Sequence, residues 1–271
     1  MPHSEAEIVQ IARLNNYYSL AGSSTLQSIT NRVCDCGYIG HSNATRSEAD
    51  RIISMLGFER QTNLLDLGAG AGWPGLYFAK ECGCHLTLLD LPEAGLKLAA
   101  ERAIEDGISE RVQTVRGDAS CLPFDSNSFS AITHSDVLCC LLPKREALKE
   151  CRRVISDNGK MAFSVIDVAP GLSPADRADA LDAGPDFVDS DEPYLDLLAG
   201  TGWKIRSCKD LTADLEHTYV KMIGAERDYE DELRRIAGDD FYEEAQASWA
   251  KKLLAVRRGQ LRRYLYFATP A

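Results

Sequence analysis

The glycines of the stretch LLDLGAGAGWPG can form a ligand-binding turn in two registers. Gly70, Gly72 and Gly75 spell G-x-G-x-x-G, the pattern of a dinucleotide-binding loop. Gly68, Gly70 and Gly72 spell G-x-G-x-G, and Asp66 stands two positions before them. The first register predicts hydride transfer and the second predicts methyl transfer, so the choice between them decides the chemistry.

The end of the preceding predicted strand favours the second register. In a nucleotide-binding turn the first glycine directly follows the strand, because the chain reverses sharply there. The apolar run from Leu64 to Leu67 stops at Gly68. The carboxylate of Asp66 would repel a pyrophosphate, whereas it would attract a sulfonium cofactor that carries an ammonium group. We therefore expect the turn to begin at Gly68 and to bind a cation, with a tight turn that binds nothing as the alternative.

A second carboxylate, Asp90, ends the next predicted strand, HLTLLD. An acidic side chain at this place accepts hydrogen bonds from ribose hydroxyls, in a nicotinamide cofactor as well as in a sulfonium one. A short-chain dehydrogenase would also need a tyrosine followed four residues later by lysine, and none of the ten tyrosines has one. The residues thus favour methyl transfer over hydride transfer.

The elements that position these residues alternate between short apolar runs and amphipathic stretches. Pro92 opens one predicted helix, and a second covers residues 144–155. This alternation predicts a parallel sheet covered by helices on both faces, in which the last strand lies at the edge. The predicted strands cover residues 63–67, 85–90, 111–118, 130–136, 160–167, 202–208 and 260–269.

The flanking segments predict a cover for the site. We expect residues 1–60 to form an N-terminal helical cap and residues 61–271 to form the main domain. Residues 212–258 are polar and helical, with apolar side chains spaced by four, and are predicted to form a lid insert before the last strand. A pair of packing helices without any covering role is the alternative.

Charge and composition narrow the class of partner. The chain of 271 residues has 41 acidic and 30 basic residues, a net charge of −11, which disfavours nucleic acids and anionic membranes. It has neither a signal peptide pattern nor a membrane span, so we expect a cytoplasmic protein, a monomer or a homodimer, with reduced thiols. The nine cysteines lack zinc-site spacing, and we expect no metal. Cys34 and Cys36 are expected to be packing residues, with a thiol or metal role as the alternative.

Four successive segments resemble the motifs of class I S-adenosylmethionine-dependent methyltransferases that act on small molecules, the methyltransferase type 11-like family. They are LLDLGAGAGWPG, LTLLDLPEAGLKLA, VQTVRGDASCLPFDSNSFSAI and CRRVISDNGKMAF. The resemblance covers residues 62–167, with one departure at Asp157-Asn158-Gly159, where that family often has Pro-Gly-Gly. It implies a Rossmann-like α/β fold with a seven-stranded, mostly parallel sheet and an antiparallel last strand.

The resemblance also implies a role for individual residues in holding S-adenosylmethionine. The methionine portion would be surrounded by the residues of the glycine turn, the ribose held at the end of the second strand and the adenine after the third. An N-terminal tyrosine would close the site, and a backbone carbonyl from the fourth strand would face the cofactor. The residues in this order are Asp66, Gly68, Ala69, Gly70, Asp90, Leu91, Asp118, Ala119, Tyr17 and His134.

The stretch THSDVLCCLL resembles the acceptor segment of methyltransferases that act on phosphoethanolamine or glycine-derived amines. Asp136 matches the aspartate of that segment, whereas Cys140 stands where the family has histidine. Tyr17 and Tyr18 resemble the N-terminal tyrosine that pairs with this histidine. The acceptor is therefore predicted to be a small molecule, an amine or a polyketide-like compound, and a phosphobase is disfavoured.

Two residues are candidates for catalysis. His134 could act as a general base or contribute only its backbone, and we favour the backbone role. Asp136 could pair with a cationic amine or cap a helix. Tyr38 and His41 could reach over the site or belong to an ordinary turn. The competing functions are a nicotinamide-dependent oxidoreductase and an S-adenosylmethionine-binding protein without catalysis.

Overall fold

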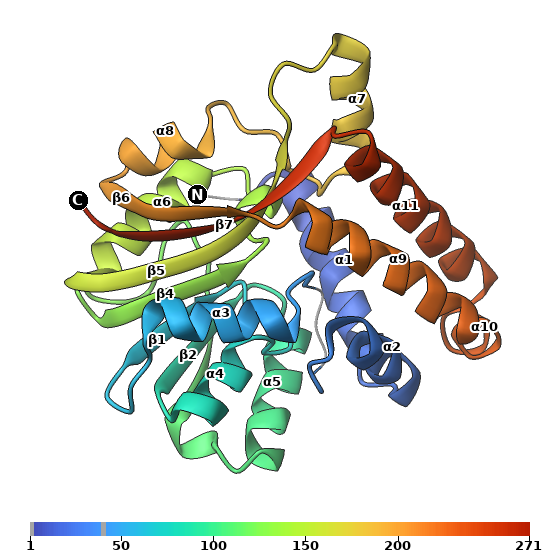
Figure 1. The fold of residues 1–271 in the computed structure, drawn as a ribbon. Helices are drawn as coiled ribbons and strands as arrows, with labels where there is room; N and C mark the ends of the chain where they lie inside the picture. The colour runs from blue at the N-terminus through green and yellow to red at the C-terminus, as the bar shows by residue number, and fades with distance from the viewer. Residues whose placement is uncertain (1–2, 39–41) are drawn as a thin grey trace.

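The computed structural model describes residues 3–38 and 42–271, which build one seven-stranded sheet (Figure 1). The strands are β1 (Asn63–Leu67), β2 (His85–Asp90), β3 (Val112–Arg116), β4 (Phe129–Ser135), β5 (Ile155–Val168), β6 (Trp203–Asp210) and β7 (Leu261–Pro270). Their spatial order is β3-β2-β1-β4-β5-β7-β6. The strands β1 to β5 pair in parallel, and β7 is antiparallel to both β5 and β6. The predicted mostly parallel sheet with a reversed last strand is confirmed.

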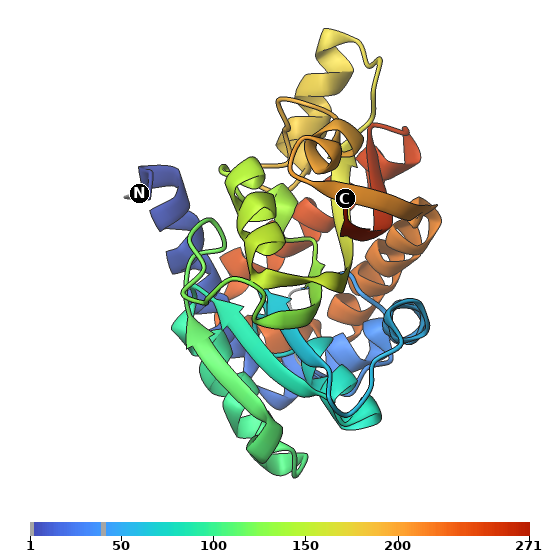
Figure 2. The same ribbon diagram turned by 90° about the vertical axis from the view of Figure 1, so that its left-hand side faces the viewer.

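Helices cover both faces of the sheet, as the apolar runs of its central strands require. Helices α3 (Arg46–Leu56), α4 (Gly75–Cys82) and α5 (Glu93–Glu105) lie on one face. Helices α6 (Lys144–Val154) and α8 (Tyr194–Ala199) lie on the other (Figure 2). Two short 3-10 helices, Ser109–Arg111 and Leu138–Cys140, complete the connections.

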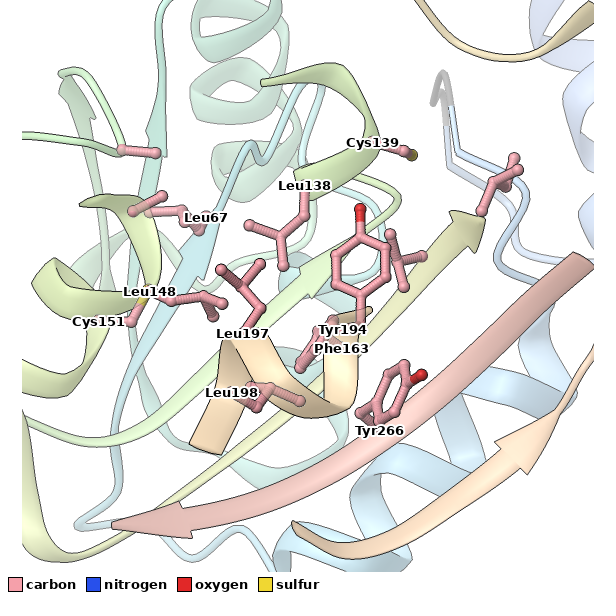
Figure 3. Close-up of a cluster of buried hydrophobic side chains, with 14 of the residues drawn as sticks. Leu67, Leu138, Cys139, Leu148, Cys151, Phe163, Tyr194, Leu197, Leu198 and Tyr266 are labelled. Atoms are coloured by element: carbon pink, nitrogen blue, oxygen red, sulfur yellow. The ribbon is translucent and has the colours of Figure 1, made fainter. Parts of the chain in front are cut away.

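The second of these faces holds a core rich in aromatic rings (Figure 3). Phe163 of β5 is stacked on Tyr266 of β7 at a centroid distance of 5.1 Å. Tyr194 and Leu197 of α8 pack in the same cluster as Leu138. This packing fixes the carboxyl ends of β4 and β5, where the predicted site lies.

The other helices gather beyond the carboxyl ends of the parallel strands (Figure 1). They are α1 (Glu5–Ala21), α2 (Ser24–Cys34), α7 (Pro174–Ala183), α9 (Thr212–Asp228), α10 (Glu230–Ala237) and α11 (Asp239–Arg257). Helix α1 packs on α5, and α2 packs on α9, which in turn packs on α11. N-terminal segments and the segment before β7 therefore meet at one end of the sheet.

Two expectations from the sequence were wrong in detail, and the predicted helical segment before the last strand is divided. Strand β7 lies between β5 and β6, so the edges of the sheet are β3 and β6 and the segment 260–269 is not an edge strand. Strand β5 begins at Ile155, directly after α6. The run of apolar residues spaced by four in the predicted lid belongs to two helices, because Gly238 with φ 95° breaks the helix there. Within the described residues, no helix combines the length and the apolar character of a membrane span.

Candidate functional site

The candidate site lies where the strand order reverses. Strand β1 is followed in space by β2 on one side and β4 on the other, and ligands of open α/β sheets bind at such a switch point. A cavity of about 30 Å³ is found here, which has room for a few water molecules at most. Its walls come from Tyr18, Ser42, Asp66, Ser135 and the glycine turn.

The glycine turn adopts the backbone that the second register predicts. Gly68 and Gly70 follow β1 directly and have φ values of 64° and 52°, which favour glycine. A Cβ atom at Gly68 would overlap Val137, and one at Gly70 would overlap the hydroxyl of Tyr18. The turn thus brings its backbone close to its neighbours and leaves no room for side chains.

Asp66 is a buried carboxylate with one unpaired oxygen. Its Oδ1 accepts a hydrogen bond of 2.7 Å from Thr133, while Oδ2 faces Gly75 without a hydrogen bond of normal geometry. Burial raises the pKa of Asp66 to about 7, against the hydrogen bond from Thr133, which lowers it. A buried oxygen without a partner next to a cavity is suited to a cationic ligand.

Asp90 connects the end of β2 to the glycine turn. Its two oxygens accept backbone hydrogen bonds from Gly70 (2.6 Å) and Leu91 (2.7 Å). A carboxylate has about four acceptor positions, so two of them are left for ribose hydroxyls. Burial raises the pKa of Asp90 to about 6.

Asp118 and Ala119 follow β3 at the same end of the sheet as the glycine turn. Asp118 Oδ1 accepts hydrogen bonds from the amide and the hydroxyl of Ser120, at 2.7 and 2.8 Å. Its Oδ2 lies 3.7 Å from Nε2 of His3, just before α1. Helix α1 therefore runs along the row of predicted cofactor residues, from Asp118 to the glycine turn.

Of the two adjacent tyrosines on α1, Tyr18 lines the cavity, whereas the role predicted for Tyr17 in holding the cofactor stays a prediction. Neighbouring side chains of a helix point about 100° apart, so the two tyrosines point in different directions. The pKa of Tyr18 is raised by burial and then by Asp90, and Cys140 also raises it. The pKa of Tyr17 is raised by burial and then by the charge of Glu226 on α9.

His134 points its ring away from the cavity. The ring is 2% exposed and stacks on Phe163 at a centroid distance of 4.4 Å, on the face of the sheet that carries α6. Neither ring nitrogen has a hydrogen-bond partner, and burial lowers the pKa to about 3. A group with this pKa accepts protons poorly at neutral pH, so the geometry favours the backbone role over the general base.

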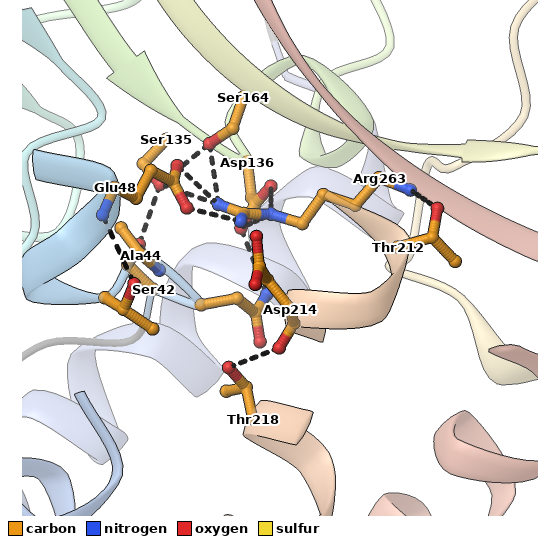
Figure 4. A network of polar contacts seen from close by, with 12 residues as sticks. Ser42, Ala44, Glu48, Ser135, Asp136, Ser164, Thr212, Asp214, Thr218 and Arg263 are labelled. Atoms are coloured by element: carbon orange, nitrogen blue, oxygen red, sulfur yellow. Dashed lines mark hydrogen bonds and ion pairs between the residues drawn. The ribbon is translucent and has the colours of Figure 1, made fainter. Parts of the chain in front are cut away.

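Asp136 takes part in a buried ion-pair network that the sequence did not reveal (Figure 4). The guanidinium of Arg263 on β7 is 2.9 Å from Asp136 and donates two hydrogen bonds to Glu48 on α3, at 2.6 and 3.0 Å. It also donates to Ser164 of β5 at 2.7 Å, and Asn43 donates to Asp136 at 3.0 Å. Neither proposed role of Asp136, pairing with an amine or capping a helix, took this internal cation into account.

Tyr38, Cys34 and Cys36 are not among the residues that line the cavity. Tyr38 stacks on Trp73 and donates a 2.8 Å hydrogen bond to Asp106, while His41 lies outside the described residues. Cys34 and Cys36 are buried in the core between α2 and α3. Among the described residues, no group of three His, Cys, Asp or Glu side chains is arranged to hold a metal ion.

Residues 65–163 match the family model described as "Methyltransferase domain". These residues form a class I methyltransferase domain. The matched segment begins in β1 and ends in β5, so it contains the glycine turn, Asp90, Asp118 and Asp136. Helix α1 and strand β7, which complete the site, lie outside it.

Relatives of the methyltransferase domain extend the similarity over more of the chain. A glycine/sarcosine/dimethylglycine N-methyltransferase of Actinopolyspora halophila is 26% identical over 207 residues, which are 73% of this chain and 36% of that protein. A phosphoethanolamine N-methyltransferase 2 of Haemonchus contortus, in complex with phosphomonomethylethanolamine and S-adenosylhomocysteine, superposes with a TM-score of 0.77 at 17% identity. That match covers 91% of this chain and 57% of the other.

The cyclase SpnF has the same fold over almost its whole length. It superposes with a TM-score of 0.75 at 20% identity and covers 94% of both chains. The chain spans between a third and about a half of the length of the curated relatives it matches first. The fold is thus shared with proteins of more than one activity. The reaction of this protein therefore has to be inferred from the residues of its site.

Proposed function

We propose that this protein transfers a methyl group from S-adenosylmethionine to a small amine. The observation that carries this proposal is the buried carboxylate of Asp66 in the wall of the cavity at the switch point, where Thr133 is its side-chain hydrogen-bond partner. A nicotinamide dinucleotide would bring its pyrophosphate to this carboxylate, and like charges repel strongly where water is excluded. A sulfonium with an ammonium group has the complementary charge.

The residues of the site fit this donor. Asp66 and the backbone of Gly68, Ala69 and Gly70 would hold the methionine portion, together with the carbonyl of His134. When bound, S-adenosylmethionine supplies an activated methyl group, whose bond to sulfur breaks as a lone pair of the acceptor bonds to carbon, and the electron pair stays on sulfur. Tyr18 would then cover the turn, because its hydroxyl already lies against Gly70.

The other end of the donor would lie along the ends of β2 and β3. The free acceptor positions of Asp90 suit the ribose hydroxyls, and Leu91 would pack on the adenine. Asp118 would accept the adenine amino group, and the amide of Ala119 would donate to a ring nitrogen. His3 near Asp118 would have to give way to the adenine.

The charge around the cavity favours an amine as the acceptor. Asp66, Asp136 and Glu48 are buried and Asp90 is partly so, while Arg263 is the cation that lies among them. An anionic acceptor would meet an excess of negative charge, whereas a protonated amine would be attracted. The net charge of −11 supports this reading at long range. We further propose that the protein acts in the cytoplasm without a nucleic-acid partner, as a monomer or a homodimer.

Radiolabelled donor tests the proposal directly. The protein is incubated with methyl-labelled S-adenosylmethionine and with glycine, sarcosine or ethanolamine, and we expect labelled methylated amine. Donor binding without a labelled product from any amine would favour the non-catalytic alternative. Binding of NADH in place of the sulfonium compound would favour the oxidoreductase.

Asp90→Ala serves as the binding variant in this experiment. Loss of a charged hydrogen-bond acceptor costs about 1.5–3 kcal/mol per bond, so the affinity for S-adenosylhomocysteine should fall at least about tenfold. Glu93→Ala, an exposed carboxylate at the start of α5, is the matched control and should bind like the wild type. Unchanged affinity of the Asp90 variant would contradict the ribose assignment.

A further inference from the structure

Three serine hydroxyls form a continuous chain from the cavity to the buried ion-pair network (Figure 4). Ser42 and Ser135 line the cavity, and their Oγ atoms are 2.8 Å apart. Ser135 Oγ lies 3.1 Å from Oγ of Ser164, which is fully buried on β5. These residues come from the loop before α3, from β4 and from β5, so only the tertiary fold aligns them.

The chain ends on a carboxylate. Ser164 lies beside Glu48 and lowers its pKa as a hydrogen-bond donor. Glu48 also receives two hydrogen bonds from the guanidinium of Arg263. Because Arg263 donates to Ser164 Oγ, the hydroxyl hydrogen of Ser164 is free to point to Glu48. Ser135 can then donate to Ser164, and its own oxygen accepts from Ser42, whose place as donor an ammonium group in the cavity would take. All hydrogen bonds of the chain can therefore run in one direction, from the cavity to Glu48.

The net charge of the group formed by Glu48, Asp136 and Arg263 favours the binding of one proton. Glu48 and Asp136 together face the single guanidinium of Arg263, so the three groups carry an excess negative charge when both carboxylates are ionised. Burial and the charge of Asp136 raise the pKa of Glu48, while Arg263 opposes them. The thiol of Cys34 on α2 also faces Glu48, and Tyr219 on α9 faces Asp136 and Arg263. A proton on Glu48 would turn the network into a neutral group, which burial favours.

An amine acceptor needs a path by which it can lose a proton before it is methylated. At neutral pH a simple aliphatic amine is protonated and has no lone pair for the methyl group, and His134 with its buried ring cannot take the proton. Ser135 is a hydroxyl at the cavity, and a hydroxyl both accepts and donates.

We propose that Ser135 and Ser164 form a proton relay that carries one proton from the bound ammonium group of the acceptor to the carboxylate of Glu48. The proposal rests on the proposed function, because it names how that reaction frees its nucleophile. The ammonium proton moves to Ser135 Oγ, the proton of Ser135 moves to Ser164, and that of Ser164 moves to Glu48. The nitrogen keeps the electron pair of the broken N–H bond. After the product leaves, Glu48 returns the proton through the same chain to water.

The test is the pH dependence of turnover in Ser164→Ala. The rate is measured from about pH 6 to about pH 10 with whichever of glycine, sarcosine or ethanolamine the wild type methylates. General acid–base assistance contributes about 10²–10⁴-fold, so kcat of the variant should fall at least about tenfold at pH 7. It should recover towards the wild type at high pH, where the free amine prevails in solution. The KM for S-adenosylmethionine should stay unchanged.

Matched variants separate a relay from a structural role. Ser135→Ala breaks the same chain at the cavity and should show the same shift, which keeps the test valid if Ser164→Ala fails to fold. Ser135→Thr keeps the hydroxyl and should restore the wild-type profile. Thr201→Val removes another buried hydroxyl, one that donates to Leu197 at the end of α8, and should change neither kcat nor its pH dependence.

Two results would overturn the relay. One is a wild-type pH profile in the folded serine variants, and the other is a loss of kcat that is equal at every pH. A wild type that methylates none of the amines at any pH contradicts the proposed function itself, and the relay with it. A wild type that is active alongside serine variants with an unaltered profile contradicts the relay alone.

Discussion

At the scale of single residues, the site keeps a carboxylate in a place that is costly for folding. Asp66 is 2% exposed and has one oxygen without a partner, so its charge is stabilised by Thr133 alone among side chains. Such a group persists where a ligand supplies the missing charge. Stability without the donor and affinity for the donor should therefore change in opposite directions when Asp66 is altered.

We expect Asp66→Asn to stabilise the protein and to weaken donor binding. The folded-state pKa of about 7 lies above the unfolded value, so the wild type loses stability as the pH rises from about 4 to about 7. Asparagine has no such loss. The free energy of unfolding of the variant should therefore exceed that of the wild type by at most about 4 kcal/mol above pH 7, and the difference should vanish near pH 4. Urea unfolding at several pH values measures this gain.

Calorimetry with S-adenosylmethionine completes the test of Asp66. The variant should bind at least about tenfold more weakly at pH 8, because an ion-assisted contact is lost. A variant that is destabilised equally at every pH, or that binds the donor like the wild type, would contradict the role given to Asp66.

At the scale of elements, one arginine joins helix α3 to three strands. Arg263 on β7 contacts Glu48 on α3, Ser164 on β5 and Asp136 after β4. Asp136 has φ 55°, an uncommon value for a residue other than glycine, and its amide donates to Ser164 at 2.9 Å. The network therefore fixes the segment that borders the cavity as well as the helix above it.

Removal of this arginine should be strongly destabilising. Arg263→Met leaves two buried carboxylates without their cation, which costs about 3–5 kcal/mol in comparable ion pairs. Adding Glu48→Gln should recover part of the loss, because one of the two charges is then gone. Urea unfolding of the single and double variants measures both effects, with Arg206→Met as the control.

The control removes an exposed arginine from the neighbouring strand β6, where it bonds only Thr269 among the side-chain contacts found. It should stay within about 0.5 kcal/mol of the wild type. Equal losses for Arg263→Met and Arg206→Met would mean that the buried network contributes nothing beyond an ordinary surface contact.

Helix α1 is the second element with a distinct task, because its Tyr18 forms part of the wall of the cavity in which we propose that the donor binds. Tyr18 closes the cavity, and Asn15 accepts a 3.2 Å hydrogen bond from the amide of Ala94 at the start of α5. A cavity of about 30 Å³ cannot admit the donor unless this helix shifts. Opening of α1 and donor binding should therefore be coupled.

We expect S-adenosylhomocysteine to slow amide hydrogen exchange in α1. A ligand held under the helix adds contacts to the closed form and so lowers the population of the open form. Helix α7 contacts α11 and β5 and takes no part in the cavity, so its exchange through local opening should be unchanged. Exchange in α1 that does not respond to saturating ligand would show that the donor binds elsewhere.

At the scale of the whole molecule, the candidate site lies at the carboxyl ends of the parallel strands, and helices gather over that end of the sheet. Segments far apart in the sequence, α1, α2 and α9 to α11, meet there (Figure 1). A ligand in the cavity at this end contacts α1, the turn after β1 and the end of β4 at once. Its binding should thus raise the stability of the entire protein.

Thermal unfolding with different ligands tests this expectation and separates the two cofactor classes. At a concentration about 100 times its Kd, a ligand that binds only the folded state adds about 2.7 kcal/mol. S-adenosylhomocysteine should raise Tm accordingly, whereas NADH at the same concentration should leave it unchanged. A larger rise with NADH would support the oxidoreductase instead.

The sequence by itself determined the sheet and the glycine turn, because both depend on local patterns. Apolar runs that end in glycine or aspartate predicted β1 and β2 within their observed bounds, and the class of methyltransferase followed from motifs in the same stretch. The register that begins at Gly68 needed only the end of a strand and one carboxylate. Such signals lie within a few residues of each other, so one-dimensional spacing is sufficient.

Only the tertiary structure decided which side chains meet. Glu48 and Arg263 are 215 positions apart, and no spacing rule joins an acid on α3 to a base on β7. The same holds for Ser42 with Ser135, and for the place of Tyr18 in the wall of the cavity, which depends on how α1 is rotated on α5. The position of β7 between β5 and β6 was likewise set by long-range strand pairing. Contacts of this kind arise from the packing of whole elements, and a linear pattern carries no record of that packing.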